Sequence, residues 1–373
     1  MDGVDVAITE FKKHEITSII SLTEPYPEIL KSQVEQLSRD NKPYTLAKIA
    51  DLDIRVGNHF ADALLALLSK NHVCPQDVIG IGNHGQTLLH KPTEPFPFSW
   101  QIGNSPTIAV KTGIPTAYDF RSVDVARGGQ GAPLVPPFHK WLFNKTDGEV
   151  IVVNIGGISN ISILRQNSVE AYGFDCGPGN CLLDVWCRKN NQGPFDKNGA
   201  WASSGKLIKP LLDLMLEDHY FKLPTPKSTG SDYFNEEFIG SYLQKANQLT
   251  AEPKDVQNTL TMLTVESIAL SIEKIGLKTG STAYFCGGGC KNTTLLGNLQ
   301  RRLAPLSVFT TDSVGVDPDF VEAAAFAWFA RQRLSGIPTR LGTQPDQSSL
   351  LLGSLVFPPG VKAHESLLFN HVS

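Results

Sequence analysis

The stretch GFDCGPGN, residues 173–180, holds the residues whose types and spacing best suit catalysis. Asp175 ends a predicted strand, and Gly177, Pro178 and Gly179 force a sharp turn before the predicted helix CLLDVWCRKN. A carboxylate at such a junction can face a cleft and act as a general base. The alternative is an N-cap or Asx-turn aspartate, which is the commoner role for this residue type before a helix.

Two glycine-rich turns follow β-branched strands and can bring main-chain N–H groups close to phosphate oxygens. Gly156 and Gly157 interrupt EVIVVNIGGISNISILR, and Gly287, Gly288 and Gly289 end the strand of TAYFCGGGCKN. Neither segment has the pattern of a P-loop or of a dinucleotide-binding turn. Taken alone, each is better explained as a tight turn.

Polar side chains also gather in predicted loops of the first half. His84 and Gln86 lie in HGQT after the strand VIGIG, and Asp119 and Arg121 lie in YDFRSVD, followed by the glycine-rich RGGQGAPLVP. Such groups suit a hydroxylated ligand, because each sugar hydroxyl wants a donor and an acceptor. The alternatives are a turn histidine and a surface ion pair between Arg121 and Asp119 or Asp124.

Two later segments add candidates. Glu322 stands in the first turn of the predicted helix DFVEAAAFAWFARQRL, where the structural alternative is interaction with the helix dipole. KSTGSDYFN, residues 227–235, is typical of a loop that could close over a ligand.

Length and composition narrow the class of protein. A chain of 373 residues favours two domains, and a net charge of −4 gives no electrostatic footprint for nucleic acid or an anionic membrane. No segment is typical of a transmembrane helix or a secretory signal, so a cytoplasmic protein is predicted. The six cysteines form no paired CxxC framework, which favours reduced thiols and disfavours a zinc site at Cys286 and Cys290.

The two halves repeat one order of elements. DGVDVAITEF and EITSIISL predict strands, residues 45–70 a helix, and DVIGIGNHGQT a strand ending in a glycine loop. In the second half EVIVVNIGGISNISILR and SVEAYGFD predict three strands, TAYFCGGGCKN a fourth, and residues 292–303 a helix. If the halves are duplicates, DGVDVAITEF corresponds to GGISNISILR, and EVIVVN has no counterpart. This predicts that a first strand and turn, on the order of ten residues, are missing.

The motifs together resemble a known family. In order they are DGVDV, GNHGQT, QIGN, DFRSVD, GGQGAPLVP, NIGGISNIS, DCGPGN, PKSTGSDYFN, CGGG and EAAAFAWFA. This chain resembles anhydro-N-acetylmuramic acid kinase from residue 2 to about residue 357.

The resemblance implies an α/β fold of the sugar kinase, actin and chaperone ATPase superfamily, with two ribonuclease-H-like domains and an ATP cleft between them. The domains expected are 1–132, lacking its first strand, and 133–340, with 341–373 returning to the first domain. It also implies a small-molecule amino sugar and ATP as partners, Mg²⁺ as cofactor, and a homodimer, without nucleic acid or membrane.

The implied reaction is phosphorylation of the 6-oxygen of 1,6-anhydro-N-acetylmuramic acid by ATP while water opens the anhydro bridge. By similarity Asp175 is the base that activates the water. The residues expected around ATP are Asp2, Gly3, Val4, Asp5, Gly156, Gly157, Asn160, Gly287, Gly288 and Gly289. The sugar-side candidates are His84, Gln86, Asp119, Arg121 and Glu322, and Mg²⁺ is expected mainly on ATP, near Asp2 or Asp5.

The chain departs from the family at its start. Members carry a Met-Ser-Gly-Thr-Ser turn before Leu-Asp-Gly-Val-Asp, and here Met1 stands at the position of that Leu. The leading hypothesis is the kinase. The alternatives are a catalytically impaired nucleotide- or sugar-binding homologue, a chain that misfolds without its first strand, and another transferase of the superfamily.

Overall fold

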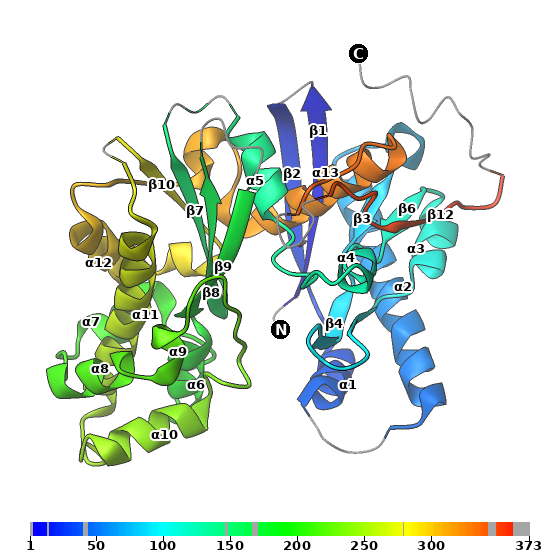
Figure 1. The fold of residues 1–373 in the computed structure, drawn as a ribbon. Helices are drawn as coiled ribbons and strands as arrows, with labels where there is room; N and C mark the ends of the chain where they lie inside the picture. The colour runs from blue at the N-terminus through cyan, green and yellow to red at the C-terminus, as the bar shows by residue number, and fades with distance from the viewer. Residues whose placement is uncertain are drawn as a thin grey trace. The chain divides into compact units, whose positions relative to one another are not determined.

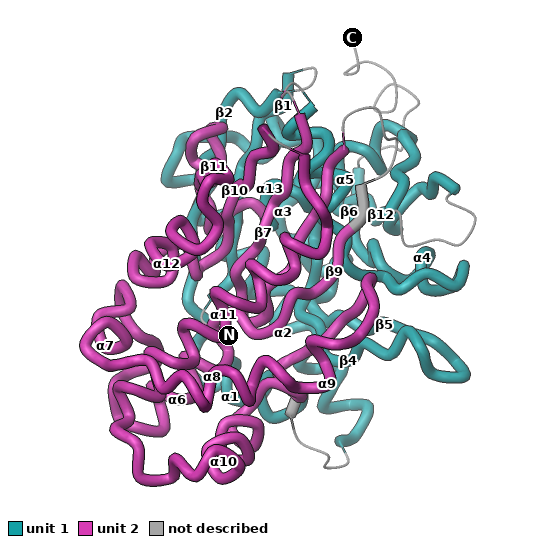
Figure 2. Tube along the Cα trace, turned by 60° about the vertical axis from the view of Figure 1, so that its left-hand side comes forward, with its two compact units in different colours: residues 1–144, 322–373 teal, residues 145–321 magenta. Residues whose placement is uncertain are grey.

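The computed structural model describes residues 3–12, 15–39, 44–144, 146, 148–165, 171–278, 280–341 and 348–360. The chain forms two compact units (Figure 2): unit 1 holds residues 1–144 and 322–373, and unit 2 holds residues 145–321. Unit 2 is therefore inserted into the sequence of unit 1. The predicted Asp2 lies outside the described residues.

Unit 2 is built around a five-stranded sheet in the order β11-β10-β7-β8-β9 (Figure 1). β8 is antiparallel to β7 and β9, whereas β10 and β11 run parallel to β7. Three antiparallel strands followed by two parallel strands make the ribonuclease-H-like sheet that the resemblance implies. The strands are β7 (Val150–Ile155), β8 (Ile158–Leu164), β9 (Ala171–Pro178), β10 (Thr282–Cys286) and β11 (Ser307–Thr310).

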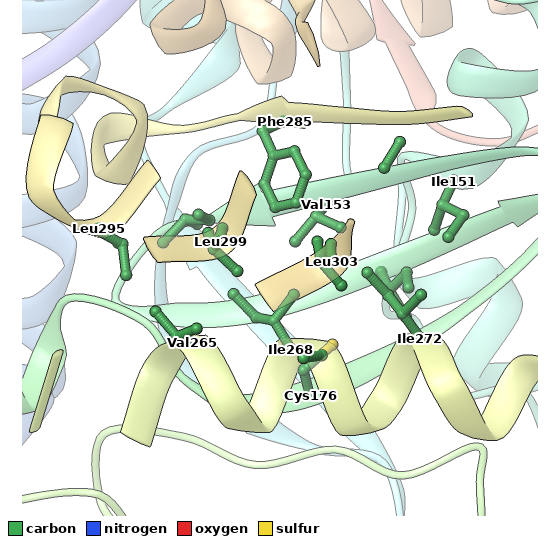
Figure 3. Packing of buried hydrophobic residues seen from close by; sticks show 14 of the residues in the cluster. Ile151, Val153, Cys176, Val265, Ile268, Ile272, Phe285, Leu295, Leu299 and Leu303 are labelled. Carbon is green, nitrogen blue, oxygen red and sulfur yellow. The ribbon is translucent and has the colours of Figure 1, made fainter. Parts of the chain in front are cut away.

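One of two buried hydrophobic clusters of unit 2 joins this sheet to the helices of residues 253–275 and 293–303 (Figure 3). Val265, Ile268 and Ile272 of α11 (Pro253–Ile275) pack with Ile151 and Val153 of β7. The other described helical segments of the unit are α6 (Cys181–Lys189), η2 (Lys197–Gly199), α7 (Ala200–Ser203), α8 (Lys209–Leu216), α9 (His219–Lys222), α10 (Glu236–Lys245), η3 (Gly288–Lys291), α12 (Thr293–Leu303), η4 (Thr311–Val314) and η5 (Pro318–Phe320). Each fully buried Ile or Val contributes about 1.5–3 kcal/mol, so this layer fixes the strands that carry the candidate residues.

The strand pairs of unit 1 run in the same relative directions as those of unit 2, but they belong to separate small sheets. β1 (Gly3–Lys12) and β2 (Glu15–Pro25) form an antiparallel pair, and β3 (Ile81–Asn83) lies parallel to β6 (Thr116–Tyr118). β12 (Ser354–Val356) pairs antiparallel with β6. The other elements are α1 (Glu28–Arg39), α2 (Leu46–Lys70), η1 (Pro75–Asp77), β4 (Gln86–Lys91), β5 (Phe98–Ile102), α3 (Ser105–Thr112), α4 (Ser122–Ala126), α5 (Pro136–Leu142) and α13 (Val321–Leu334).

The long helix α2 illustrates how the sequence sets these elements. Its N-cap is Thr45, whose side chain accepts a hydrogen bond from the Lys48 N–H. Leu52, Val56 and Leu67 are among the buried residues that recur at helical spacing along its inner face. Among the described residues, no helix is both long and apolar enough to cross a membrane.

The compact units divide after Asn144 and after Val321, whereas the predicted domains divide at 132 and 340. The difference comes from two helices that pack within unit 1. The first contact is between Phe138 of α5 and Trp328 of α13, whose ring centroids are 6.1 Å apart. The second is between α13 and β3: these elements lie so close that a Cβ added to Gly82 would be 1.9 Å from the Phe326 carbonyl oxygen. The boundaries of the ribonuclease-H-like domains stay a prediction, because compactness alone does not define them.

Candidate active site

Asp175 lies on β9 of unit 2, beside an irregularity in the pairing of that strand with β8. Asn160 faces Asp175 and Ser159 faces Gly177, so Cys176 is an extra residue that bulges from the ladder. Bulges re-aim side chains and occur often next to active sites. The turn that follows leads into α6, as the sequence predicts, but the helix N-cap is Asn180 rather than Asp175.

Asp175 is held by the loop that contains Lys227 and Thr229. The Asp175 N–H donates to the Lys227 carbonyl oxygen at 2.9 Å, and the Thr229 N–H donates to Asp175 Oδ2 at 2.9 Å. From the other side, the Tyr220 hydroxyl donates to the Asp175 carbonyl oxygen at 2.6 Å. Both the backbone and the carboxylate of Asp175 are therefore fixed by the segment that the sequence predicts as a closing loop.

Burial raises the pKa of Asp175 to about 6, against the lowering effect of the Thr229 N–H. At pH 7 such a carboxylate is mostly ionised, yet it is a stronger base than an ordinary aspartate. This combination is what a general base operating near neutral pH requires.

A row of polar residues crosses the sheet at Asp175. Asn154 of β7 is opposite Asn160 of β8, and Asn160 is opposite Asp175 of β9. Residues directly opposite each other across antiparallel strands share one face of the sheet, so the three side chains lie side by side. Sequence reasoning found Asn160 and Asp175 but missed Asn154, which stands just ahead of the Gly156 turn.

The glycines of unit 2 divide into two kinds. A Cβ on Gly287 or Gly289 would lie 2.3 Å from atoms of Asn154 or Ile155, so these two are required for packing. Gly288 and Gly157, by contrast, are exposed. A Cβ added to Gly288 would have no atom within 4 Å, and a Cβ added to Gly157 would have only the Cys181 Cβ, at 3.9 Å. Open space over the main chain at Gly157 and Gly288 is what the approach of a phosphate group needs.

In unit 1, His84 and Arg121 contact each other directly. Arg121 Nη2 lies 2.8 Å from His84 Nε2, Arg121 Nε donates to the same atom at 3.2 Å, and Arg121 Nη1 donates to the Gly131 carbonyl oxygen. Burial, reinforced by the charge of Arg121, lowers the pKa of His84 to about 3. The ring is neutral, with Nε2 as acceptor and the proton on Nδ1.

The surrounding turns are held by two residues that sequence reasoning did not assign to the site. Asn83 is buried, donates to the Gly103 carbonyl oxygen at 2.7 Å and accepts from the Gly85 N–H at 3.0 Å, so it joins the turn after His84 to the segment that follows β5. Asp124 is buried and accepts from the Gly131 N–H at 2.6 Å. The motif GNHGQT carried the signal for Asn83, since its Asn precedes a glycine that requires a positive φ.

A first cavity of about 850 Å³ is lined by residues of unit 1, including His84, Gln86 and Glu322. The desolvating surroundings and the charge of Asp5 raise the pKa of Glu322, whereas the charge of Arg121 lowers it. Glu322 lines this cavity, and its side chain is accessible from it. Gly3, Val4 and Asp5 line the same cavity, so predicted nucleotide and sugar residues meet there.

Asp119, the remaining sugar-side candidate, lies at a second cavity, which has a volume of about 550 Å³. Asp119, at a positive φ of 54°, lines it together with His84 and residues that sequence reasoning missed. Asp53 is one of these: its carboxylate accepts from the Gly103 N–H and from Asn104 Nδ2, both at 2.8 Å. Asp53 stands far from these residues in the sequence, inside a helix, and only the motif QIGN marks its partners.

Oxygen ligands suitable for Mg²⁺ are present at the first cavity. Asp5 accepts from Thr23 Oγ1 at 2.6 Å, and its negative charge acts on Glu322. Mg²⁺ is usually held by one or two carboxylates together with substrate phosphates, so these residues fit the ion that the resemblance implies. Among the described residues, no group of three His, Cys, Asp or Glu side chains could hold a metal by itself.

Comparison with known proteins gives a match along almost the whole chain. The family model described as anhydro-N-acetylmuramic acid kinase matches residues 1–358. The protein of that name from Pasteurella multocida (strain Pm70) is 42% identical over 358 residues, covering 96% of this chain and 94% of the relative. The one from Vibrio cholerae serotype O1 is 40% identical over 359 residues, covering 96% of each.

Solved structures are more distant. The activator of the 2-hydroxyisocaproyl-CoA dehydratase from Clostridium difficile, with bound ADPNP, is 11% identical at a TM-score of 0.41, covering 86% of this chain and 88% of that one. The sequence match is the decisive finding, because both the family model and the relatives span nearly the full length. The chain belongs to the anhydro-N-acetylmuramic acid kinase family.

Proposed function

We propose that this protein is an ATP-dependent kinase that phosphorylates the 6-oxygen of 1,6-anhydro-N-acetylmuramic acid while water opens the anhydro bridge. The product is N-acetylmuramic acid 6-phosphate, and the reaction serves the recycling of cell-wall peptidoglycan. Membership in the family supports the reaction. The observation that carries it is the setting of Asp175, a carboxylate at the end of a strand with a pKa of about 6 and a main-chain clamp.

The proposed step begins with a water molecule at the anomeric carbon. Asp175 takes one proton from this water as its oxygen bonds to C1, and the bond between C1 and O6 breaks with its electron pair on O6. O6 bonds to the γ-phosphorus of ATP as ADP leaves, and Asp175 then releases its proton to solvent. This is the role of the base in an inverting glycosidase, coupled to phosphoryl transfer.

Main-chain groups and carboxylates are assigned to the nucleotide. N–H groups at Gly156, Gly157 and Gly288 would donate to phosphate oxygens, and Asn160 would stand between them and Asp175. Asp5 would accompany Mg²⁺, which neutralises developing charge on the phosphates when bound. Asp2, Gly3, Val4, Gly287 and Gly289 complete this assignment.

The sugar is assigned to the polar residues of unit 1. The neutral His84 is oriented by Arg121 and lines both cavities, and Glu322 and Asp119 offer acceptors. Gln86 can both donate and accept. A mixed set of donors and acceptors matches the hydroxyl, acetamido and lactyl groups of the acceptor. We further propose a cytoplasmic location and a homodimer, which rest on the resemblance alone.

The test is the release of ADP by the protein supplied with Mg-ATP and 1,6-anhydro-N-acetylmuramic acid. Replacement Asp175→Asn should lower kcat by about 10²–10⁴-fold with little change in ATP affinity, since this is the usual contribution of a positioned base. The rate of the unaltered protein should fall roughly tenfold per pH unit below about pH 6, where Asp175 becomes protonated.

The control is Asp51→Asn, at an exposed position of α2, which should leave the rate unchanged. Retention of turnover by Asp175→Asn would exclude Asp175 as the base. Absence of turnover in the unaltered protein with this acceptor, but activity with another sugar, would overturn the proposed substrate.

A further inference from the structure

Three hydrogen bonds join Asp175, Lys227 and Tyr220 of unit 2 into a closed hydrogen-bond triangle. The Asp175 N–H donates to the Lys227 carbonyl oxygen at 2.9 Å, and the Lys227 ammonium donates to the Tyr220 carbonyl oxygen at 2.7 Å. The Tyr220 hydroxyl closes the triangle by donating to the Asp175 carbonyl oxygen at 2.6 Å. Because each residue donates to the next, a shift of Lys227 or Tyr220 must disturb the main chain of Asp175.

The Lys227 ammonium contacts Tyr220 in two ways. Besides its bond to the carbonyl oxygen, it lies 4.1 Å from the centroid of the Tyr220 ring, within the range of a cation–π interaction. Burial lowers the pKa of Lys227 to about 8, together with the charge of Lys274 and against that of Cys176. The ammonium is thus partly dehydrated, and Tyr220 supplies contacts that offset the loss of water.

Tyr220 is itself held in one orientation. It lies in α9 (His219–Lys222), beside β9 (Figure 1), and is 3% exposed. A helix of one turn is marginal by itself, so its ends need partners. The N-cap Asp218 accepts from the Tyr220 N–H at 2.8 Å and from the Tyr242 hydroxyl at 2.7 Å. The Tyr220 hydroxyl therefore reaches β9 from a fixed base.

Lys274 of α11 shows what a purely structural lysine does at the same place. Its ammonium donates at 2.9 Å to the carbonyl oxygen of Phe221, the residue after Tyr220. Both lysines thus satisfy carbonyl groups near the C-terminal end of α9, a usual role for cationic side chains. They differ in that Lys227 belongs to the hydrogen-bond triangle, whereas the bond from Lys274 lies outside it.

We propose that Lys227 is a positioning residue for Asp175: its ammonium fixes Tyr220, and Tyr220 fixes the main chain that carries the Asp175 carboxylate. This inference rests on the proposed function, in which Asp175 is the base. A base must lie within about 2.6–3.2 Å of the group whose proton it takes, and a displacement of about 1 Å can lower the rate on the order of 10²-fold. Lys227 acts through Tyr220 and takes no part in bond making.

The first test compares kcat and KM in three variants supplied with Mg-ATP and 1,6-anhydro-N-acetylmuramic acid. Lys227→Met removes the ammonium and keeps an unbranched side chain, and Tyr220→Phe removes the hydroxyl alone. Both should lower kcat by about 10–100-fold and leave both KM values within about twofold. Lys274→Met is the matched control and should keep the kcat of the unaltered protein. An unchanged kcat in Lys227→Met, or an equal loss in Lys274→Met, would overturn the proposal.

A double-mutant cycle separates positioning of Asp175 from a general loosening of the protein. Lys227→Met added to Asp175→Asn should change the residual rate by less than about twofold, because the group that it positions is already gone. A further fall as large as that caused by Lys227→Met alone would show that Lys227 acts elsewhere, and would overturn the proposal.

Hydrogen exchange tests the geometry without ligands or turnover. The amides of Asp175 and Thr229 are observed, since the first donates to Lys227 and the second to Asp175 Oδ2. Lys227→Met should speed their exchange by about tenfold or more, and Lys274→Met should not, because opening of the hydrogen-bond triangle exposes these N–H groups. Unchanged exchange in Lys227→Met would overturn the positioning role alone. Turnover that survives Asp175→Asn would instead overturn the proposed base, and the positioning role with it.

Discussion

At the scale of single residues, the raised pKa of Asp175 carries a cost in stability. A shift from 3.8 to about 6 means that the folded protein holds the carboxyl proton more tightly than the unfolded chain does. The penalty is fully present above pH 6 and disappears as the pH falls from 6 towards 4. Two pKa units correspond to at most about 3 kcal/mol.

Replacement Asp175→Asn should therefore raise the free energy of unfolding by about 1–3 kcal/mol at pH 8, and by much less at pH 4.5. Urea denaturation at the two pH values measures the difference, with Asp51→Asn as the exposed control. A stabilisation of the same size at both pH values would show that charge burial is not its cause.

Arg121 leads to a second residue-scale prediction. Its guanidinium reaches His84 and the Gly131 carbonyl oxygen at once, which a lysine ammonium cannot reproduce. Arg121→Lys should lower kcat/KM for the sugar by about 10–100-fold, since hydrogen bonds to charged groups contribute about 1.5–3 kcal/mol. Arg301→Lys, on an exposed face of α12, should have no effect. An unchanged kcat/KM in Arg121→Lys would remove Arg121 from the sugar site.

At the scale of elements, the turn at residues 177–180 packs main chain against main chain. The Asn180 N–H donates to the Gly156 carbonyl oxygen at 2.8 Å, and a Cβ on Gly179 would lie 2.3 Å from that same oxygen. The loop after Asp175 and the β7–β8 turn are thus one rigid structure. They can pack this closely because Gly179 has no Cβ.

Gly179→Ala should therefore destabilise the protein by about 1–3 kcal/mol, the usual cost of overpacking, and lower ATP affinity. The matched control is Gly240→Ala in α10, where nothing lies within 4 Å of the new Cβ. Alanine there should be neutral or stabilise the helix by up to about 1 kcal/mol. Urea denaturation and ATP titration of both variants test this prediction. Equal stability and equal ATP affinity in the two variants would mean that the turn at Gly179 accommodates a Cβ without strain.

The elements themselves could be predicted from local sequence, because β-branched runs and helical periodicity determine them. The helix predicted over 45–70 is α2, Leu46–Lys70, and the strands predicted around Gly156 are β7 and β8. What local sequence could not provide is cross-strand neighbours. Asn154 and Asp53 belong to the candidate sites only through pairing and packing with residues distant in sequence.

At the scale of the whole molecule, the duplication could be inferred from the repeated order of strands, helix and glycine loop, and the strand directions of the two units agree with it. The division into units was harder to predict from the sequence. α5 and α13 belong with unit 1 because aromatic side chains such as Phe138, Trp141 and Trp328 pack together there. Such contacts join residues nearly two hundred positions apart, and no local pattern reports them.

The insertion of unit 2 within unit 1 has a consequence for synthesis on the ribosome. Unit 2 is contiguous and can fold as soon as it has emerged, but unit 1 needs α13 and β12, which are translated after it. At ~5–20 residues per second, the nascent β1–β2 hairpin and β3–β6 pair wait on the order of ten to seventy seconds for their last partners. During that interval open strand edges are exposed in the cell, so chaperone dependence should centre on the first unit to be translated and the last to close.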